Sequence, residues 1–492
     1  MMRRILHLSQ LVLLLCSLVA PAASAAEPQA DPEAWRAVAP TPLPAKSVAT
    51  PVPQVFRLGA MEVLLIERHD LPTISLQLLL AGGSAWDPPG REGQASLCME
   101  LLEAGAAKLN LDEISDKKAD LAVAIDAWTG VEQQGLNMAV LSRNFLPSLD
   151  LFADLLLHPS LGPRHLANAV ARRKAALLQT QANPALVARR VAGPVAYGAQ
   201  AWGRLATEAS LSALDVAGCT QHDAALSPEG AHLYVVGDVT RPALEKAWLA
   251  RFGEWKTPAP KLAPLGKPLP PAGRVFAVDL PGAEQTLLHI MAPGPERTAT
   301  DYEATTLMMG VLATGFTSRI NMNLREKHGW TYGAGGSFQY RRDGSLLSLT
   351  AAVRVDASGP SVSEMVSEIN TIRASPVTLD ELAREKEGDI LELPARWSTG
   401  KSIANTLQTL QYYGLPLNWY DGYAARVQAV DLAALQKAAR DHLDVDAAVV
   451  LIVGDFKKIT PQIEALISSG PLAGQVVHRL DTDGKPLPAL AK

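Results

Sequence analysis

The 492-residue sequence has little of several things that would mark a specialised class of protein. It contains three cysteines, and its formal net charge is only −5. A charge this small leaves no electrostatic footprint of a nucleic-acid-binding protein. Three cysteines are too few for a disulfide-rich scaffold. The chain therefore depends on a hydrophobic core for its stability. Beyond the N-terminal segment, no uninterrupted apolar run reaches the roughly 18 residues of a membrane-spanning helix.

The N-terminal segment is the exception to this ordinary composition. Arg3 and Arg4 form a basic start, Leu11–Ala20 is a mostly apolar run, and Ala23–Ala25 is a small-residue cleavage signature. These three parts predict a signal peptide over residues 1–25. We therefore expect an exported protein that resides in a bacterial periplasm, with secretion as the alternative.

The three cysteines carry different expectations. Cys16 lies inside the predicted signal peptide and raises a lipoprotein alternative, but Leu15 before it is bulkier than such processing prefers. After cleavage, Cys98 and Cys219 remain, and neither belongs to a C-x-x-C pair. Two cysteines form at most one disulfide. We interpret both as buried thiols.

Proline-rich segments divide the mature chain. Residues 26–53 include seven prolines and predict an extended leader, and residues 257–273 predict a linker between domains. This division leaves one domain at 54–256, a second at 274–480, and a short tail at 481–492. The two domains have nearly equal lengths.

The two domains also share sequence patterns. HLYVVGDVT at His232–Thr240 matches AVVLIVGDFK at Ala448–Lys457, and the two Gly-Asp pairs are 217 residues apart. PSLDLFADLL, which begins at Pro147, matches PSVSEMVSEI, which begins at Pro360, at an offset of 213 residues. Similar offsets for separate matches predict one duplicated domain rather than coincidence.

Strand and helix patterns alternate within each domain. Thr73–Leu80 and Leu347–Val355 place apolar residues at period two, which is typical of strands with one buried face. A capping box that starts at Asn110 predicts one helix. Leu166–Val191 predicts another, bent at Pro184. Helices that pack on sheets, twice over, indicate an α+β fold.

The sequence resembles the M16 peptidase family. Three features show this resemblance: the segment AGGSAWDPPGREG at Ala81–Gly93, the segment LREKHGWTY at Leu324–Tyr332, and the paired strand-Gly-Asp segments. The resemblance extends over about residues 50–480. It implies two homologous duplicated domains, each a mixed, mainly antiparallel sheet packed with helices, in a LuxS/MPP-like metallohydrolase fold.

Active members of that family carry an inverted zinc motif, H-x-x-E-H, in which two histidines bind zinc and the Glu activates a water. The corresponding stretch here is GQASLCME, with Ser96, Met99 and Glu100 at the three motif positions. The family pattern adds a further Glu ligand some seventy residues on, but residues 155–207 contain no acid. The sequence therefore predicts no catalytic residue, no metal and no cofactor on this chain.

Arg325 and Tyr332 remain as candidate functional residues. By the resemblance, they hydrogen-bond carbonyl oxygens of a peptide that is held for cleavage, a task that suits a guanidinium fork and a phenol. Their local sequence alone indicates only a surface ion pair and a half-buried ring. The resemblance further implies a partner chain that carries H-x-x-E-H and the zinc, so that this chain is the non-zinc subunit of a heterodimer. The alternative is a stand-alone peptide-binding or scaffold protein.

Other polar groups carry weaker signals. Seven basic residues and no acid lie between Arg164 and Arg204, which is typical of a solvated helix face and could also line a cavity. His158 and His165 have no acidic neighbour between them and are interpreted as structural or surface residues. A hydrolase triad is suggested only by the nearness in sequence of Asp215, His222 and Ser227, without a G-x-S-x-G elbow.

Overall fold

The computed structural model describes residues 33, 36, 49–265 and 273–488. Contacts divide the chain into two units, Met1–Ser47 and Val48–Lys492. Only Glu33 and Arg36 of the first unit are described. The predicted signal peptide therefore lies outside the described residues, as do most of the leader and linker residues 266–272. Every helix in the described part of the chain is too short or too polar to span a membrane.

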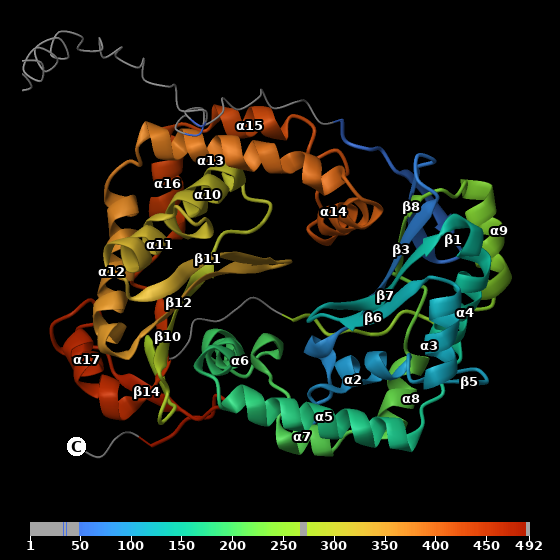
Figure 1. Ribbon diagram of the computed structural model, residues 1–492, viewed down its shortest axis with the longest axis horizontal. Coiled ribbons are helices and arrows are strands. Elements are labelled where there is room, and N and C mark those ends of the chain that lie inside the picture. Colours follow the sequence, from blue (N-terminus) through green and yellow to red (C-terminus); the bar gives the residue numbers. More distant parts are fainter. Residues whose placement is uncertain (1–32, 34–35, 37–48, 266–272, 489–492) are drawn as a thin grey trace, which may run out of the picture. The chain divides into compact units, whose positions relative to one another are not determined.

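The first half of the larger unit is built around a mixed sheet (Figure 1). Its described strands, in spatial order, are β1 (Gln54–Leu58), β2 (Met61–Glu67), β8 (His232–Gly237), β3 (Thr73–Ala81), β7 (Gln133–Leu141) and β6 (Ala124–Thr129). Strands β2 and β8 are parallel and the other neighbours are antiparallel. A two-stranded ribbon joins β4 (Gly105–Ala106) to β5 (Leu109–Asn110).

Helices surround this sheet. They are α2 (Gln94–Leu101), α3 (Leu111–Asp120), α4 (Phe145–Leu157), α5 (Pro163–Gln181), α6 (Pro184–Tyr197), α7 (Glu208–Ser212), α8 (Val216–Ala224) and α9 (Arg241–Phe252). Asn110 caps α3 in a capping box with Glu113, as the sequence predicts. The predicted bend at Pro184 is wrong. A proline at the first helical position begins a new helix, so the stretch folds as α5 and α6.

The second half repeats this plan. Its described strands, in spatial order, are β11 (Thr331–Arg341), β12 (Gly344–Arg354), β10 (Gln285–Gly294), β13 (Val449–Gly454), β9 (Val275–Asp279) and β14 (Val477–Leu480). The helices are α10 (Tyr302–Met309), α11 (Arg319–Asn321), α12 (Ser358–Ala374), α13 (Leu379–Glu392), α14 (Gly400–Tyr412), α15 (Tyr423–Ala429), α16 (Leu432–His442) and α17 (Phe456–Ser468). Two π-helical segments, Gly310–Thr314 and Met322–Lys327, follow α10 and α11.

The pairing pattern confirms the duplication. In the second sheet, β9 and β13 are parallel neighbours, and β10, β12 and β11 follow in antiparallel order. Strands β2, β8, β3, β7 and β6 have the same order and directions in the first sheet. The two matched Gly-Asp segments end the equivalent strands β8 and β13. Only the sixth strand differs, because β1 is antiparallel to β2 and β14 is parallel to β9.

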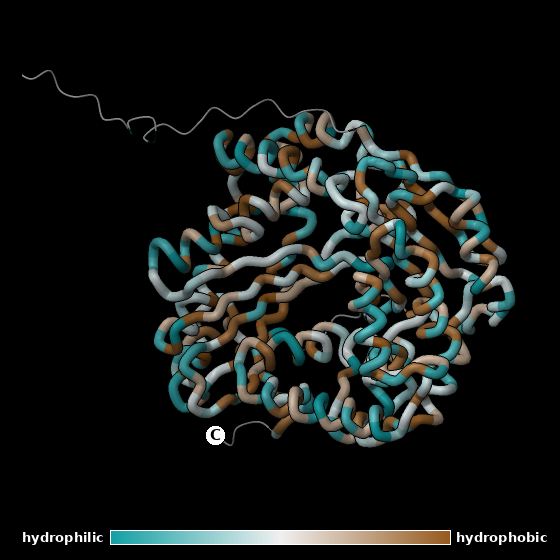
Figure 2. The backbone as a smooth tube through the Cα atoms, turned by 45° about the vertical axis from the view of Figure 1, so that its right-hand side comes forward, coloured by the Kyte–Doolittle hydropathy of each residue, from teal (hydrophilic) through white to brown (hydrophobic). Residues whose placement is uncertain are grey.

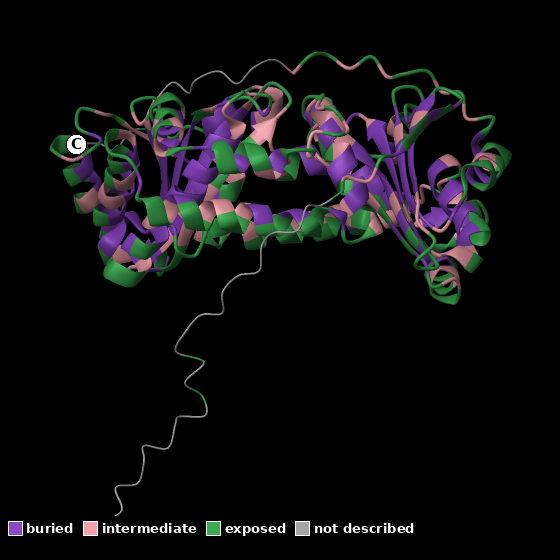
Figure 3. Ribbon diagram, turned by 90° about the horizontal axis from the view of Figure 1, so that it is seen from above, coloured by how far each residue is buried: buried purple, intermediate pink, exposed green. Residues whose placement is uncertain are grey.

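Both faces of each sheet are apolar. On β3, Ile74, Leu76, Leu78 and Leu80 join the core that α4 and α9 cover, as the period-two pattern predicts. Leu79 points to the opposite face and is also buried. Figures 2 and 3 show the hydrophobic and buried residues concentrated along the strands. Each sheet therefore needs a helical layer on both sides.

The two halves supply the second layer to each other. Helix α14 of the second half packs on the outer face of the first sheet, where Ile403 and Leu407 contact Leu64 and Val236. Helix α6 of the first half packs in the same way on the second sheet, through residues that include Val191. Figure 1 shows α14 beside β8 and β3, and α6 beside β10. This reciprocal packing joins the halves by apolar burial.

Hydrogen bonds set the register of the exchanged helix α14. Gln77 of β3 donates to the Asn405 side chain at 2.8 Å, and the Tyr234 hydroxyl donates to Gln411 at 2.5 Å. Gln77 and Tyr234 are buried, whereas Asn405 is exposed and Gln411 is half-buried. Because the two buried side chains need partners, these bonds favour one position of the helix on the sheet.

The reciprocal packing predicts a large effect of one core truncation. Leu407→Ala should lower the free energy of unfolding by about 2–5 kcal/mol, because Leu407 is fully buried between α14 and the first sheet. Leu391→Ala is the matched control, since Leu391 on α13 is 49% exposed. Urea unfolding followed by circular dichroism measures both. Equal effects of the two substitutions would contradict the packing described here.

Candidate functional sites in the two halves

Helix α2 carries the residues at the degenerate motif positions. Gly93 precedes the helix in a left-handed conformation with φ of 98°. The buried Asp87 carboxylate accepts hydrogen bonds from the backbone amides of Gly93 and Ala95, at 2.7 and 2.8 Å. Burial raises the pKa of Asp87 despite these bonds. The turn before α2 thus fixes where the helix begins and which side chains it presents.

The three motif positions have different environments. Met99 is fully buried in the core of the first half. Together with Ser96 and Glu100, it lines a cavity of about 610 Å³ between α2, α5 and the edge strand β6. A buried thioether, a hydroxyl and a single carboxylate do not form the three-ligand set that a catalytic zinc requires.

Two arginines of α5 bind the remaining carboxylate. Arg172 and Arg173 donate to the two oxygens of Glu100 at 2.7 and 2.6 Å. Arg173 also donates to the hydroxyl and the carbonyl of Ser96, both at 3.1 Å. Burial acts to raise the pKa of Glu100, but the hydrogen bonds from Arg173 and Arg172 hold it below its ordinary value. Glu100 is therefore ionised and already paired.

This arrangement is unfavourable for a metal ion. The arginines lie 72 and 73 positions after Glu100, in the segment where the family pattern expects an acidic ligand. A dication at Ser96 and Glu100 would meet two guanidinium charges at contact distance. In addition, the described residues contain no group of three or more His, Cys, Asp or Glu side chains that could hold a metal. The residues present do not fit a zinc ion.

The prediction of buried cysteines is confirmed, but the prediction that they are free thiols is wrong. Cys98 of α2 and Cys219 of α8 form a disulfide across 121 residues of chain, with Sγ atoms 2.04 Å apart. Both residues are fully buried in a small apolar cluster with Leu97 and Leu211. The separation of the two cysteines by 121 positions gave no local signal of their pairing. The predicted signal peptide was a general indication, because disulfides persist in oxidising compartments outside the cytosol. The bond ties the helix of the degenerate motif to α8.

The second half brings Arg325 and Tyr332 together. Both line a shallow cavity of about 540 Å³ beside β11, which is the edge strand of its sheet. Arg325 lies in the π-helical segment, which ends where Gly329 adopts a left-handed φ of 63°. The Trp330 amide then donates to the Leu324 carbonyl at 2.9 Å. This turn returns the chain to the cavity at the start of β11.

A bulge presents Tyr332. The register between β11 and β12 shifts between Thr331 and Ala334, and the Tyr332 side chain is 92% exposed. The Thr331 hydroxyl stabilises the bulge, because it accepts from the Gly333 amide at 3.1 Å and donates to the Ala352 carbonyl at 2.6 Å. An exposed phenol on a fixed backbone is available to a ligand. The half-buried ring that local sequence suggests is not what the structure shows.

Asn321 and Phe316 complete this cavity, and neither stands out in the sequence. The Arg325 guanidinium lies over the Phe316 ring, with its Cζ atom 4.4 Å from the ring centroid. Asn321 is buried, donates to the Phe316 carbonyl at 2.6 Å and accepts from the Ala334 amide at 3.1 Å. One side chain thus fixes both the loop under Arg325 and the strand beside Tyr332.

The other polar candidates have structural roles. Asp215 caps α8 and pairs with Arg91 at 2.6 Å. His222 contacts Asp223 and Gln134, while Ser227 donates to the Thr257 carbonyl at 2.6 Å. Because these three side chains have separate partners, no triad forms. Neither His158 nor His165 belongs to a group that could hold a metal within the described ranges.

The basic segment from Arg164 to Arg204 is only partly a solvated face. Arg190 is half-buried and pairs with Asp483 at 2.9 Å, and Arg204 donates to the Asp87 carbonyl at 2.8 Å. Arg173 belongs to the pair with Glu100 described above. These arginines therefore make hydrogen bonds and ion pairs inside the protein. The prediction of a solvated face is confirmed for exposed members of the segment such as Arg164.

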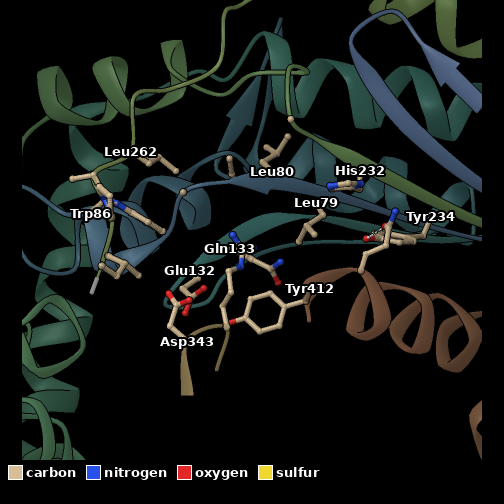
Figure 4. Close-up of a pocket in the computed structure, with 18 residues that line it drawn as sticks. Leu79, Leu80, Trp86, Glu132, Gln133, His232, Tyr234, Leu262, Asp343 and Tyr412 are labelled. Atoms are coloured by element: carbon tan, nitrogen blue, oxygen red, sulfur yellow. Dashed lines mark hydrogen bonds between the residues drawn. The ribbon is translucent and has the colours of Figure 1, made fainter. Parts of the chain in front are cut away.

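A further cavity of about 430 Å³ lies where the two halves meet (Figure 4). Its lining includes Trp86 and His232 of the first half, linker residues 262–265, and Asp343 and Tyr412 of the second half. Figure 4 shows the Glu132 carboxylate close to Asp343 and Tyr412, and burial raises the Glu132 pKa. None of the candidate site residues predicted from the sequence (Ser96, Met99, Glu100, Arg325 and Tyr332) lines this cavity.

Comparison with known proteins agrees with this architecture. Residues 62–197 match the model of insulinase, peptidase family M16, and residues 220–388 match the model of the peptidase M16 inactive domain. This chain belongs to the M16 peptidase family. The first match contains the degenerate zinc motif, and the second begins near the end of the first half and extends into the second half, where it contains Arg325 and Tyr332.

Relatives of this M16 protein are distant in sequence. The non-peptidase homolog YmxG of Helicobacter pylori is 21% identical over 415 residues, which cover 82% of this chain and 94% of YmxG. The structure of a peptidase M16 inactive domain from Pseudomonas fluorescens has a TM-score of 0.75 and 23% identity, covering 82% of this chain and 98% of that one. The fold predicted from the sequence is confirmed.

The periplasmic protease PqqL of Escherichia coli is also similar. Its structure gives a TM-score of 0.70 and 15% identity, and the match covers 85% of this chain but only 49% of PqqL. The M16 chain described here therefore corresponds in extent to about half of PqqL.

The ion pairs around Glu100 lead to a prediction about metal binding. A Ser96→His, Met99→Glu, Glu100→His variant should remain nearly free of zinc, because Arg172 and Arg173 stay in place and no third ligand is supplied. Adding Arg173→Glu should raise zinc content several-fold in metal analysis of the purified protein. Stoichiometric zinc in the first variant would contradict the electrostatic account.

The same ion pairs predict a pH dependence of stability. A carboxyl with a lowered pKa in the folded state stabilises the fold above its ordinary pKa of 4.5, and this contribution disappears as the pH falls below that value. Glu100→Gln should therefore destabilise the protein more at pH 7 than near pH 3. Thermal unfolding at both pH values measures the difference. An equal loss of stability at both would show that the charge is not responsible.

The disulfide gives a separate stability prediction. Cys98→Ala combined with Cys219→Ala should lower the free energy of unfolding by about 2–5 kcal/mol, because the cross-link constrains a long loop in the unfolded chain. Dithiothreitol should destabilise the native protein similarly and leave the double variant unchanged. If the reductant changes both proteins equally, the effect does not come from this bond.

Proposed function

We propose that this M16 protein is the substrate-holding, non-zinc subunit of a heterodimeric zinc metalloendopeptidase. The observation that carries the proposal is the separation of the two sites. The first half has lost the metal ligands and fills their place with arginine–glutamate pairs. The second half keeps Arg325 and Tyr332 on one cavity, beside an edge strand. A chain that holds a peptide but cannot activate water needs a partner for hydrolysis.

The geometry beside β11 supports the peptide-holding role. An edge strand has backbone groups that can pair with an extended peptide without demanding a particular sequence, and on β11 such pairing must use groups other than the Ala334 amide, which already donates to Asn321, and the Gly336 carbonyl, which already accepts from Thr314. Arg325 adds a fork of donors and Tyr332 adds a phenolic donor on the same side. In the assembled enzyme, these groups bind oxygen atoms of the substrate peptide, and the Tyr332 hydroxyl can stabilise developing charge on the scissile carbonyl.

The partner is an M16 chain that carries H-x-x-E-H and the zinc. The length comparison supports such an arrangement, because this chain matches about half of PqqL and the partner supplies a second half of similar size. The zinc belongs to that partner, and this chain contributes no ligand to it. By the N-terminal pattern of a basic start and an apolar run, the complex is exported and works in the periplasm.

The test is a substitution in the assembled complex. Arg325→Ala should lower kcat/KM for a peptide substrate by about tenfold to a hundredfold, because a charged hydrogen-bond donor to the substrate is lost. Zinc content should be unchanged, since Arg325 lies on the non-zinc chain. Lys327→Ala is the matched control, because it removes a cation two positions away that does not line the cavity.

Both outcomes are informative about the assignment of Arg325. Peptidase activity that survives Arg325→Ala in a complex of unchanged composition would refute the substrate-holding role. A loss of activity that is matched by Lys327→Ala would assign the effect to general charge rather than to the fork of Arg325.

A further inference from the structure

The cavity beside β11 has an unusual charge composition. Among its described lining residues, Arg325 is the only one with a charged side chain. The others are small, apolar or neutral polar residues: Ala313, Thr314, Gly315, Phe316, Asn321, Tyr332, Gly333, Ala334, Gly335, Gly336 and Ser337. A single cation without an acid in the same lining makes the cavity locally electropositive. The natural occupant of such a cavity is an anion or a strong acceptor.

The guanidinium group of Arg325 has unused donors. Its Nε atom lies 3.4 Å from Glu326 Oε1, and both side chains are substantially exposed, so this pair is weak. No described residue accepts a hydrogen bond from either terminal nitrogen. The guanidinium also lies over the Phe316 ring, which holds its plane while leaving its edge open. The two terminal nitrogens therefore form a free, oriented fork.

A carboxylate fits this fork better than a carbonyl does. Two parallel N–H···O bonds can reach the two oxygens of one carboxylate, whereas a carbonyl presents a single oxygen. We propose that the Arg325 cavity is a carboxylate-binding subsite, which makes peptides with a carboxylate beside an extended main chain the preferred substrate class. This inference rests on the proposed function, since it concerns the same peptide-holding site.

The strand next to the cavity explains why the carboxylate arrives on an extended peptide. Asn321 and Thr314 satisfy the Ala334 amide and the Gly336 carbonyl, which keeps the start of β11 in place. Gly335 lies so close to the loop that a Cβ atom there would be 2.8 Å from the Ala313 carbonyl oxygen. The loop and strand thus form one rigid wall. Either an acidic side chain or a C-terminal carboxylate can reach Arg325 from a peptide along this wall.

The test uses four peptides and the full-length chain without a partner. Each is a hexapeptide of alternating valine and threonine with an uncharged BODIPY label on its N-terminus, with either glutamate or glutamine at the fourth position and either a free or an amidated C-terminus. Fluorescence anisotropy measures their dissociation constants. A peptide with the recognised carboxylate should bind about tenfold more tightly than its neutral counterpart. The glutamate–glutamine pair and the acid–amide pair distinguish the two sources.

Substitutions connect the preference to the cavity. Arg325→Ala should abolish the discrimination, and Arg325→Lys should restore only part of it, because an ammonium keeps the charge without the fork. Phe316→Ala should reduce the discrimination, and Phe316→Tyr should preserve it, since both aromatic rings support the guanidinium. Lys327→Ala should leave it intact. This comparison separates the fork from general charge.

The results separate this inference from the proposed function. Equal binding of all four peptides, weakened equally by Arg325→Ala, would overturn the carboxylate subsite and leave the peptide-holding role standing. Discrimination that persists in Arg325→Ala would also overturn it, because another residue would then recognise the carboxylate. Failure of the native chain to bind any of the four peptides would overturn both.

Discussion

Each sheet of this protein has two apolar faces, and each half of the chain covers only one of them with its own helices. The other faces are covered by exchange, with α14 on the first sheet and α6 on the second. Burial of these faces is the dominant favourable term in such a packing. The exchange joins the halves, and both candidate sites are built on that joined frame. Helix α2 is further tied to α8 by the Cys98–Cys219 disulfide.

On this frame, the two halves have diverged in chemistry. A zinc site needs several anionic or neutral ligands. The degenerate motif instead contains arginine–glutamate pairs, and Arg173 donates hydrogen bonds to both Ser96 and Glu100. A buried or half-buried charge requires a partner, and here the arginines supply it. The charges around Ser96 and Glu100 therefore disfavour a metal ion at this position. The second half instead presents donors to solvent.

Much of the fold followed from the sequence, because its signals are local or repeated. The alternation in Thr73–Leu80 identified a strand, and the similar offsets between the halves identified the duplication. The degenerate motif was also visible, since it depends on which residue types are absent. What the sequence could not provide were contacts between distant segments. The disulfide, the Arg173–Glu100 pair and the exchange of helices all join residues at least 70 positions apart.

The candidate site in the second half shows the same division. Arg325 and Tyr332 became candidates through the resemblance of Leu324–Tyr332 to a motif of the M16 family, and the structure places them on one cavity. Phe316 and Asn321 were missed, because their importance lies in a ring stacked under a guanidinium and in two hydrogen bonds made by one buried amide. Neither property has a pattern in the sequence. A register shift on β11 likewise exposes Tyr332 for reasons that only strand pairing reveals.

The central claim is that this chain holds substrate for a zinc-bearing partner. Affinity purification of the tagged protein from its own cells, with mass spectrometry of the recovered chains and zinc analysis, tests it most directly. The account predicts a stoichiometric M16 chain with H-x-x-E-H and about one zinc per pair. Recovery of the protein alone or as a homodimer, without zinc and without such a chain, would contradict it and favour a stand-alone peptide-binding or scaffold protein.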